Sequence, residues 1–162
     1  MKIGVIIIFH DNELHIEKRF LIEQINECNA IEFCLVDNNS KDKTLQLLME
    51  IKETCSSHIS VVEIKKQNSV DTAKKAGARY MFNQFNLRHI GFVDANSIQE
   101  GHTLNMLVAS IYRNKQSIID TNLKVIENQK IRQTLFKSIF SVVEYLQNIN
   151  MKTNFNNLNP SV

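Results

Sequence analysis

Two apolar segments of the sequence run directly into acidic and amide side chains, which are the strongest candidates for chemistry. Residues 33–36 lead into Asp37, and residues 90–93 lead into Asp94 and, two positions later, Asn96. In an open parallel sheet, ligands bind outside the carboxyl ends of the strands. Side chains at those ends can meet a nucleobase, a ribose or a phosphate-bound metal ion. The pattern therefore predicts a polar site where two strands end.

Asp37 could recognise a base or serve only as a turn residue. A carboxylate at the end of a strand accepts hydrogen bonds, and the imide or amide N–H of a nucleobase is a suitable donor. However, segment 37–40 consists of Asp, Asn, Asn and Ser, which all favour turns and helix caps. These residues alone leave both interpretations open.

Asp94 and Asn96 form an i, i+2 pair just beyond a strand. Mg²⁺ and Mn²⁺ prefer oxygen ligands and often bridge one or two carboxylates and a diphosphate. Asn96 offers an oxygen without a charge, so the pair predicts a weaker ion site than two aspartates would form. An ordinary Asx turn after the strand is the alternative.

The size and composition of the chain indicate one domain without bulk affinity for nucleic acid. Its 162 residues are 43% hydrophobic, which is enough for one core. The formal net charge is +2, and acids are interspersed among the bases, so no nucleic-acid partner is expected. We expect a single domain over residues 1–147, followed by an Asn-rich C-terminal tail, 148–162, that is mobile or incomplete.

Cysteine usage and hydropathy indicate a cytoplasmic protein. Cys28, Cys34 and Cys55 are an odd number without a CxxC pair, which fits a reducing compartment. The apolar run at 3–9 is too short for a signal peptide and reads as a buried first strand. No stretch approaches the roughly 20 apolar residues that span a bilayer. Any membrane contact should therefore be peripheral.

Apolar runs alternate with helical periodicity along the chain, which predicts an α/β fold with a mainly parallel sheet and helices on both faces. The predicted strands are 2–9, 31–37, 59–64, 88–93 and 117–119. The predicted helices are 13–27, a helix capped by Asn39 or Ser40 and running to Ile51, 70–85, 100–113 and 130–147. In the first helix, we expect Leu14, Phe20, Leu21 and Ile25 to share one buried side.

Four segments together resemble a known family. They are VIIIFHDNE at 5–13, VDNNSKDKT at 36–44, QNSVDTAKKAG at 67–77 and FVDAN at 92–96. In order and spacing they resemble the inverting glycosyltransferases of family 2, which have the GT-A, Rossmann-like nucleotide-diphospho-sugar transferase fold. Within that family, they are most similar to the dolichyl-phosphate-mannose-synthase-like branch. The likeness covers about the first two thirds of the chain.

The resemblance implies roles for particular residues. The nucleotide of a UDP- or GDP-linked sugar would be bound by His10, Asp11, Glu13, Asp37, Asn39, Lys75 and Asp94. Asp94 and Asn96 would hold Mg or Mn. From the residues alone, Lys75 could equally lie on a solvated basic face, and His10 could be only the polar end of a strand.

The sequence also departs from the family pattern. Ile8 stands where the family usually has Pro, His10 where it has an aromatic, Ser69 where it has Gly, Lys75 where it has Arg, and Asn96 where it has the metal-binding Asp. Together these changes indicate a divergent member.

A catalytic base is not identifiable. Sugar transfer with inversion needs a carboxylate to deprotonate the acceptor hydroxyl. The carboxylates after Asp94 stand in no recognisable motif; they are Glu100, Asp120, Glu127 and Glu144. Where the related branch has an Asp-x-x-Cys-Gly motif, this chain has Asn154, which is not a base at neutral pH. We therefore expect a chain that lacks much of the acceptor half of the fold.

Three functions stay open on this basis. The first is a glycosyltransferase with an unknown acceptor; the second is a truncated or catalytically impaired relative that binds a nucleotide or a partner. The third is an α/β interaction module without catalysis. A P-loop and a dinucleotide fold are excluded because glycines 4, 77, 91 and 101 form neither motif. Segment 131–143 is apolar over a wide arc, which predicts core packing or, as an alternative, contact with a lipid surface.

Overall fold

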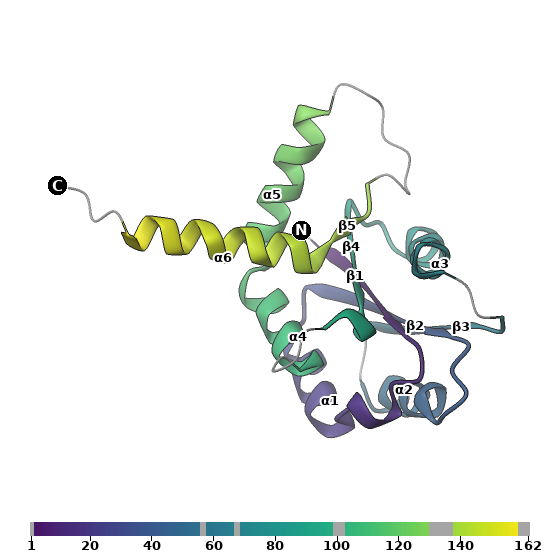
Figure 1. The fold of residues 1–162 in the computed structure, drawn as a ribbon. Helices are drawn as coiled ribbons and strands as arrows, with labels where there is room; N and C mark the ends of the chain where they lie inside the picture. Colours follow the sequence, from purple (N-terminus) through teal and green to yellow (C-terminus); the bar gives the residue numbers. More distant parts are fainter. Residues whose placement is uncertain (1, 56–57, 67–68, 99–102, 130–137, 159–162) are drawn as a thin grey trace.

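The computed structural model describes residues 2–55, 58–66, 69–98, 103–129 and 138–158, which form one parallel sheet flanked by helices (Figure 1). The strands are β1 (Ile3–Phe9), β2 (Ile31–Asn38), β3 (Ile59–Ile64), β4 (His89–Asp94) and β5 (Phe140–Ser141). The helices are α1 (Lys18–Glu27), α2 (Thr44–Thr54), α3 (Val70–Gln84), α4 (Leu104–Arg113), α5 (Lys115–Asn128) and α6 (Val142–Leu158), with short 3-10 helices η1 (Glu13–His15) and η2 (Ala95–Ser97).

The five strands lie in the order β3-β2-β1-β4-β5, and all paired strands are parallel. Helices α1, α2 and α4 cover one face, and α3 covers the other (Figure 1). This arrangement confirms the predicted α/β class. The central strand β1 is buried along its whole length, which is why its sequence is a continuous apolar run rather than an alternating one.

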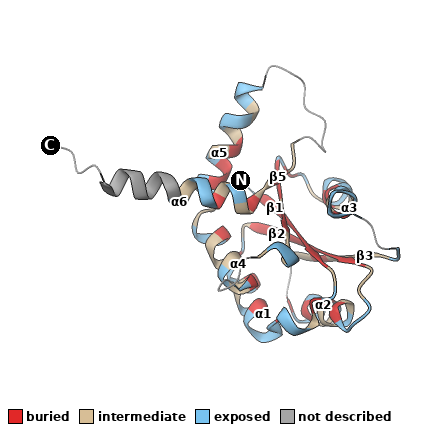
Figure 2. Ribbon diagram, in the orientation of Figure 1, coloured by how far each residue is buried: buried red, intermediate tan, exposed pale blue. Residues whose placement is uncertain are grey.

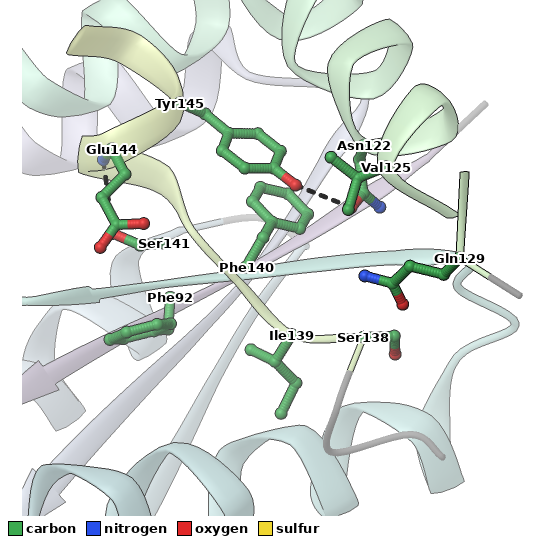
Figure 3. Close-up of a pocket in the computed structure, with 10 residues that line it drawn as sticks. All are labelled: Phe92, Asn122, Val125, Gln129, Ser138, Ile139, Phe140, Ser141, Glu144 and Tyr145. Carbon is green, nitrogen blue, oxygen red and sulfur yellow. Dashed lines mark hydrogen bonds between the residues drawn. The ribbon is translucent and has the colours of Figure 1, made fainter. Parts of the chain in front are cut away.

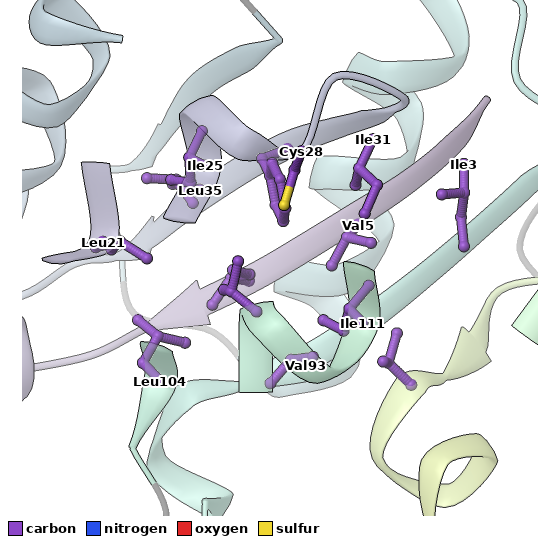
Figure 4. Close-up of a cluster of buried hydrophobic side chains, with 14 of the residues drawn as sticks. Ile3, Val5, Leu21, Ile25, Cys28, Ile31, Leu35, Val93, Leu104 and Ile111 are labelled. Carbon is purple, nitrogen blue, oxygen red and sulfur yellow. The ribbon is translucent and has the colours of Figure 1, made fainter. Parts of the chain in front are cut away.

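Alternation of side chains along β1 divides the core into two parts. Ile3, Val5, Ile7 and Phe9 point to the face covered by α1, α2 and α4, whereas Ile6 and Ile8 point to the face covered by α3. We call these the three-helix face and the α3 face. The larger cluster lies on the three-helix face (Figure 4), and the strands form the most buried part of the molecule (Figure 2).

Helix α3 approaches the sheet closely because it carries Gly77 at the contact. A Cβ atom at this position would lie 2.8 Å from Cγ2 of Ile6 and 3.0 Å from Cγ2 of Val36. Both neighbours are buried β-branched side chains with restricted rotamers. The glycine therefore sets the distance between α3 and the sheet, and with it the position of every other α3 side chain.

The predicted first helix is wrong in its N-terminal part. Residues 13–15 form η1, Ile16 is extended, and the α-helix begins only at Lys18. Leu21 and Ile25 are buried as predicted, but Leu14 is 93% exposed and Phe20 is 56% exposed. The periodicity failed because the backbone N–H groups of residues 11–13 donate to side chains of the loop after β2 and of the start of α2, which keeps these residues out of an α-helix.

The predicted cap of α2 is also wrong. The helix begins at Thr44, whose N–H donates to Asp42 Oδ1 at 2.9 Å. Ser40 instead accepts a hydrogen bond from the Asp11 N–H at 3.0 Å. The polar segment after β2 is thus a longer loop than a simple cap requires, because it bonds to a second loop.

The C-terminal predictions need correction as well. Residues 117–119 lie in α5 rather than in a strand. Ile118 and Ile119 are buried residues of the first turns of that helix. A short apolar run is compatible with either element. Of the predicted helix 130–147, residues 130–137 lie outside the described residues, 140–141 form β5, and α6 begins at Val142. Helix α6 continues past residue 148 to Leu158.

The three cysteines are free and buried. Burial raises the pKa of Cys28 to about 11, with a contribution from Glu27, and raises that of Cys34 to about 12. These thiols are therefore protonated and unreactive at neutral pH. Among the described helices, none is both long and apolar enough to cross a bilayer.

A buried polar chain connects β4 to α5 and α6. The Asn122 amide donates from Nδ2 to His89 Nδ1 at 2.8 Å, and the Tyr145 hydroxyl donates to Asn122 Oδ1 at 3.2 Å. His89 is 1% exposed and Asn122 is 2% exposed. Because Nδ1 of His89 accepts this bond, the imidazole must be neutral in the folded state.

Substituting Gly77→Ala should destabilise the fold by about 1–2 kcal/mol, because the strain of overpacking exceeds the gain in helix propensity. The measurement is urea unfolding followed by circular dichroism. Asn83→Ala on the exposed side of α3 is the matched control, since it changes helix propensity without touching the sheet. Equal or higher stability of Gly77→Ala would contradict the close approach.

Stability should fall as the pH drops below about 6.5. Burial, with a smaller effect of the Arg88 charge, lowers the pKa of His89 below its ordinary value of 6.5. The unfolded chain therefore takes up a proton first, so this contribution is complete above pH 6.5 and is lost as the pH falls toward the folded-state pKa. Urea unfolding across this range should show the slope, and His89→Gln should reduce it. An unchanged slope in that variant would count against the assignment.

Candidate functional site

Strand register places the predicted site residues at the same end of the sheet. Phe9 at the end of β1 pairs with Asp37 on β2, and Ile8 pairs with Asp94 on β4. Both carboxylates thus flank the central strand at its carboxyl end, as the sequence predicted. The loops that follow these three strands form the candidate site.

The two carboxylates start from opposite faces of the sheet. Asp37 lies two positions after Leu35 on β2 and therefore points to the same face, the three-helix face, where Leu35 lies in the cluster. Asp94 follows Phe92, which packs against the cluster on the α3 face. The structure therefore brings Asp94 to the side of α3 and its lysines, and separates it from the side chain of Asp37.

Asp37 is enclosed rather than presented to solvent. The residue is 2% exposed, and its Oδ2 accepts a hydrogen bond from the Ser40 N–H at 3.3 Å. Its Oδ1 is buried without a hydrogen-bond partner among the described residues. The turn interpretation thus has a specific contact in its favour, while the buried oxygen keeps one acceptor position for a donor that reaches it.

The loop after β1 and the loop after β2 are joined by reciprocal hydrogen bonds. Asp11 N–H donates to Ser40 Oγ at 3.0 Å, and Lys41 N–H donates to Asp11 Oδ1 at 2.6 Å. Likewise, Glu13 N–H donates to Asp42 Oδ2 at 2.9 Å, and Lys43 N–H donates to Glu13 Oε2 at 3.2 Å. We call these four bonds the loop brace.

The loop brace gives Asp11 and Glu13 a structural use that the sequence did not indicate. Each carboxylate accepts a backbone N–H from the facing loop, so part of its hydrogen-bonding capacity is already engaged. Asp11 and Asn39 have φ values of 52° and 59°, in the left-handed region that Asp and Asn tolerate better than most residues. Asn39 Oδ1 accepts from Lys41 Nζ at 3.2 Å.

Asp42 was not among the predicted residues, although it supports both loops. Desolvation raises the pKa of its carboxyl, but hydrogen bonds from the side chain of Thr44 and from the backbone amides of Glu13 and Thr44 outweigh this effect and lower the pKa. The carboxylate is therefore ionised at neutral pH and anchors η1 to the start of α2.

His10 lies between these loops with its ring partly exposed. Its Nδ1 hydrogen-bonds to the Asn38 carbonyl at 2.9 Å, so Nδ1 carries a proton. Nε2 lies 3.5 Å from Asp11 Oδ2. About 30% of the side chain is exposed, which leaves part of the imidazole available to contact a ligand.

The basic residues of α3 form a compact charged group. Asp71 forms an ion pair with each of two lysines: Lys74 Nζ lies 2.8 Å from Oδ1, and Lys75 Nζ lies 2.6 Å from Oδ2. These hydrogen bonds lower the pKa of Asp71 to about 2. Lys74 Nζ also lies 4.8 Å from the centre of the Phe92 ring, which links the group to β4. Two ammonium groups and one carboxylate leave a net positive charge there.

Asn12 was missed by the sequence analysis, and it joins the loop after β1 to the start of α2 and to Asn96. It is 3% exposed; its N–H donates to Thr44 Oγ1 at 2.7 Å, and its Oδ1 accepts from the His10 N–H at 2.8 Å. Its Nδ2 donates to Asn96 Oδ1, also at 2.8 Å. One Asn in a polar loop carries no sequence signal for such a role.

The side chains of Asp94 and Asn96 take part in hydrogen bonds within the protein, and those of Asn96 do not suit its predicted role as a metal ligand. Asp94 Oδ1 accepts the Asn96 N–H at 3.0 Å in an Asx turn. The Asn96 amide donates from Nδ2 to the His10 carbonyl at 3.1 Å, and its oxygen already accepts from Asn12. Across the described part of the chain, no three His, Cys, Asp or Glu side chains gather as metal ligands.

Two cavities adjoin this region. One, of about 290 Å³, lies beside Asn12, Asn96 and the exposed Leu14. The other, of about 320 Å³ (Figure 3), lies between β4, β5, α5 and α6. Phe92 lines the second cavity, so the Lys74–Phe92 contact connects it to the basic group on α3. The carboxylate of Glu144 also lines this cavity, from the first turn of α6.

Comparison with known proteins identifies a family. The family model described as Glycosyl transferase family 2 matches residues 4–161. The chain is similar to the crystal structure of S. aureus TarS, with 19% identity and a TM-score of 0.46 over 71% of this chain and 20% of that one. For the structure of S. aureus TarS 1-349, the identity, TM-score and coverage of this chain are the same, with 33% of that chain covered. No curated protein sequence matches significantly.

Substituting Asn12→Ala should destabilise the fold by about 1–3 kcal/mol, because it removes the two side-chain hydrogen bonds of a buried residue, to the His10 N–H and to Asn96. Urea unfolding measures the loss. Asn86→Ala, at an exposed position in the turn after α3, is the matched control and should stay within about 0.5 kcal/mol of the parent. A similarly small effect for Asn12→Ala would show that the hydrogen bonds of Asn12 do not hold the loops.

Proposed function

Because this chain belongs to glycosyltransferase family 2, we propose that it binds a nucleotide-diphosphate sugar at the carboxyl ends of β1, β2 and β4 and transfers the sugar to an acceptor. The main support is the match of the family model over residues 4–161. The chain spans a fifth to a third of the length of the TarS chains it resembles, so the activity of a whole enzyme is part of this proposal.

On the donor side, the α3 face offers the better surroundings for a diphosphate. Asp94 ends β4 on this face, and the net positive group of Lys74, Lys75 and Asp71 lies on the helix that covers it. A phosphate that reaches Lys75 would compete with Asp71 for the ammonium group. Lys75 acts as a point charge, without the two-pronged geometry that Arg offers.

The nucleobase would lie nearer the loop brace. His10 presents part of its imidazole there; Asn38 ends β2 next to it, and Asn39 follows. In this proposal Asp11 and Glu13 act mainly by holding the loops in place. Asp37 contributes through its buried oxygen only if the loop after β2 opens.

The alternative function is nucleotide or partner binding without sugar transfer. It is favoured by Asn96, which stands where the family pattern has an acidic residue. Both the oxygen and the NH₂ group of its amide form hydrogen bonds within the protein. Among the carboxylates that follow Asp94 in the sequence, Glu144 lines the cavity between β4, β5, α5 and α6. Its exposed position does not by itself make it a base for the acceptor hydroxyl.

Within the family, we propose the dolichyl-phosphate-mannose-synthase-like branch on the strength of the four motifs. A lipid-linked acceptor and peripheral contact with a membrane would follow from that placement. A cytoplasmic location is also proposed, in keeping with three free, buried cysteines. The donor nucleotide is proposed to be UDP or GDP, bound together with Mg²⁺ or Mn²⁺.

Titration calorimetry with UDP and with GDP, each in Mn²⁺ and in EDTA, should detect binding of one nucleotide. Lys75→Gln should weaken it about 5–10-fold through loss of one phosphate contact. Asp71→Asn should strengthen it about 2–5-fold, because Lys75 is released from its ion pair. Lys52→Gln on α2 is the matched control. The proposal fails if neither nucleotide binds, or if Lys75→Gln behaves like Lys52→Gln.

A further inference from the structure

The side chain of Asn96 closes a ring of hydrogen bonds that begins and ends on one residue. His10 N–H donates to Asn12 Oδ1 at 2.8 Å, Asn12 Nδ2 donates to Asn96 Oδ1 at 2.8 Å, and Asn96 Nδ2 donates to the His10 carbonyl at 3.1 Å. We call this the amide ring. It joins the end of β4 to the loop after β1, across more than 80 positions of sequence.

The orientation of both amides in the ring is fixed by chemistry. The His10 carbonyl can only accept, so the NH₂ group of Asn96 must face it. The His10 N–H can only donate, so the oxygen of Asn12 must face it. The remaining oxygen of Asn96 and the remaining NH₂ group of Asn12 then meet in the third bond. The third bond therefore follows from the other two.

A carboxylate cannot replace Asn96 in the amide ring. An aspartate there would put an oxygen about 3.1 Å from the His10 carbonyl oxygen, where the structure has a donor. A cation at Asn96 Oδ1 would share that oxygen with the NH₂ group of Asn12, whose hydrogens carry positive charge. The neutral amide thus suits the ring and does not suit an ion site.

We infer that Asn96 is a positioning residue, whose neutral side chain fixes the loop that carries His10, and that it is not a metal ligand. The ring extends further, because Asn12 N–H donates to Thr44 Oγ1 at the start of α2. His10 in turn contacts the Asn38 carbonyl. Asn96 therefore acts on all three loops of the site. Its effect on a ligand, which rests on the proposed function, is indirect.

The test compares Asn96→Asp, Asn96→Ala and the exposed control Asn86→Asp. Calorimetry measures nucleotide affinity in Mn²⁺ and in EDTA, and urea unfolding measures stability. Both Asn96 variants should lose about 3–10-fold in affinity, by a similar factor in Mn²⁺ and in EDTA, while Asn86→Asp matches the parent. The inference is overturned if Asn96→Asp binds nucleotide more tightly than the parent in Mn²⁺ alone, because position 96 would then be a ligand position.

A measurement on the unmodified protein keeps the inference testable if a variant does not fold. Nuclear magnetic resonance should show slower water exchange for the side-chain NH₂ protons of Asn96 and Asn12 than for those of Asn86. Equal exchange rates for all three would refute the amide ring. If the parent chain binds neither UDP nor GDP, the proposed function fails, whereas the exchange and unfolding results still decide the positioning role.

Discussion

The burial of β1 between β2 and β4 is the constraint on which the candidate site depends. Its side chains fill both cores, so a shift by one residue would move every side chain into the core on the opposite face and disrupt the packing of both. That register fixes Asp37 beside Phe9 and Asp94 beside Ile8. Gly77 fixes the distance of α3 from the same strands. The charged and polar groups of the site thus inherit their positions from apolar packing.

Beyond the sheet, polar contacts take over the positioning. The loop brace engages the carboxylates of Asp11 and Glu13 with backbone N–H groups, and the amide ring joins the third loop. Backbone donors in such loops lack a strand or helix partner, so side chains must satisfy them. Acidic residues near the site are therefore numerous for a structural reason. The positive group on α3 is what remains to attract a diphosphate.

Sequence reasoning recovered the parallel sheet because buried strands and amphipathic helices have distinct periods. It placed Asp37 and Asp94 at the correct ends of their strands. It failed at residues 13–17 and 39–43, where bonds between distant loops override local propensity. It missed Asn12 for the same reason, since three long-range or loop contacts define that residue and none follows from its neighbours. The sequence also did not show to which face of the sheet Asp37 and Asp94 point, because that depends on where β2 and β4 begin and end in the structure.

The departures from the family pattern have physical explanations in this fold. Ser69, where the family has Gly, caps α3 by accepting the Thr72 N–H at 3.2 Å. Ile8, where it has Pro, is 1% exposed and extends the core on the α3 face. Asn96 supplies a donor that Asp lacks. Each of these three side chains makes a contact within the protein near the candidate site. The loops of the candidate site are thus held together by side chains of the protein itself.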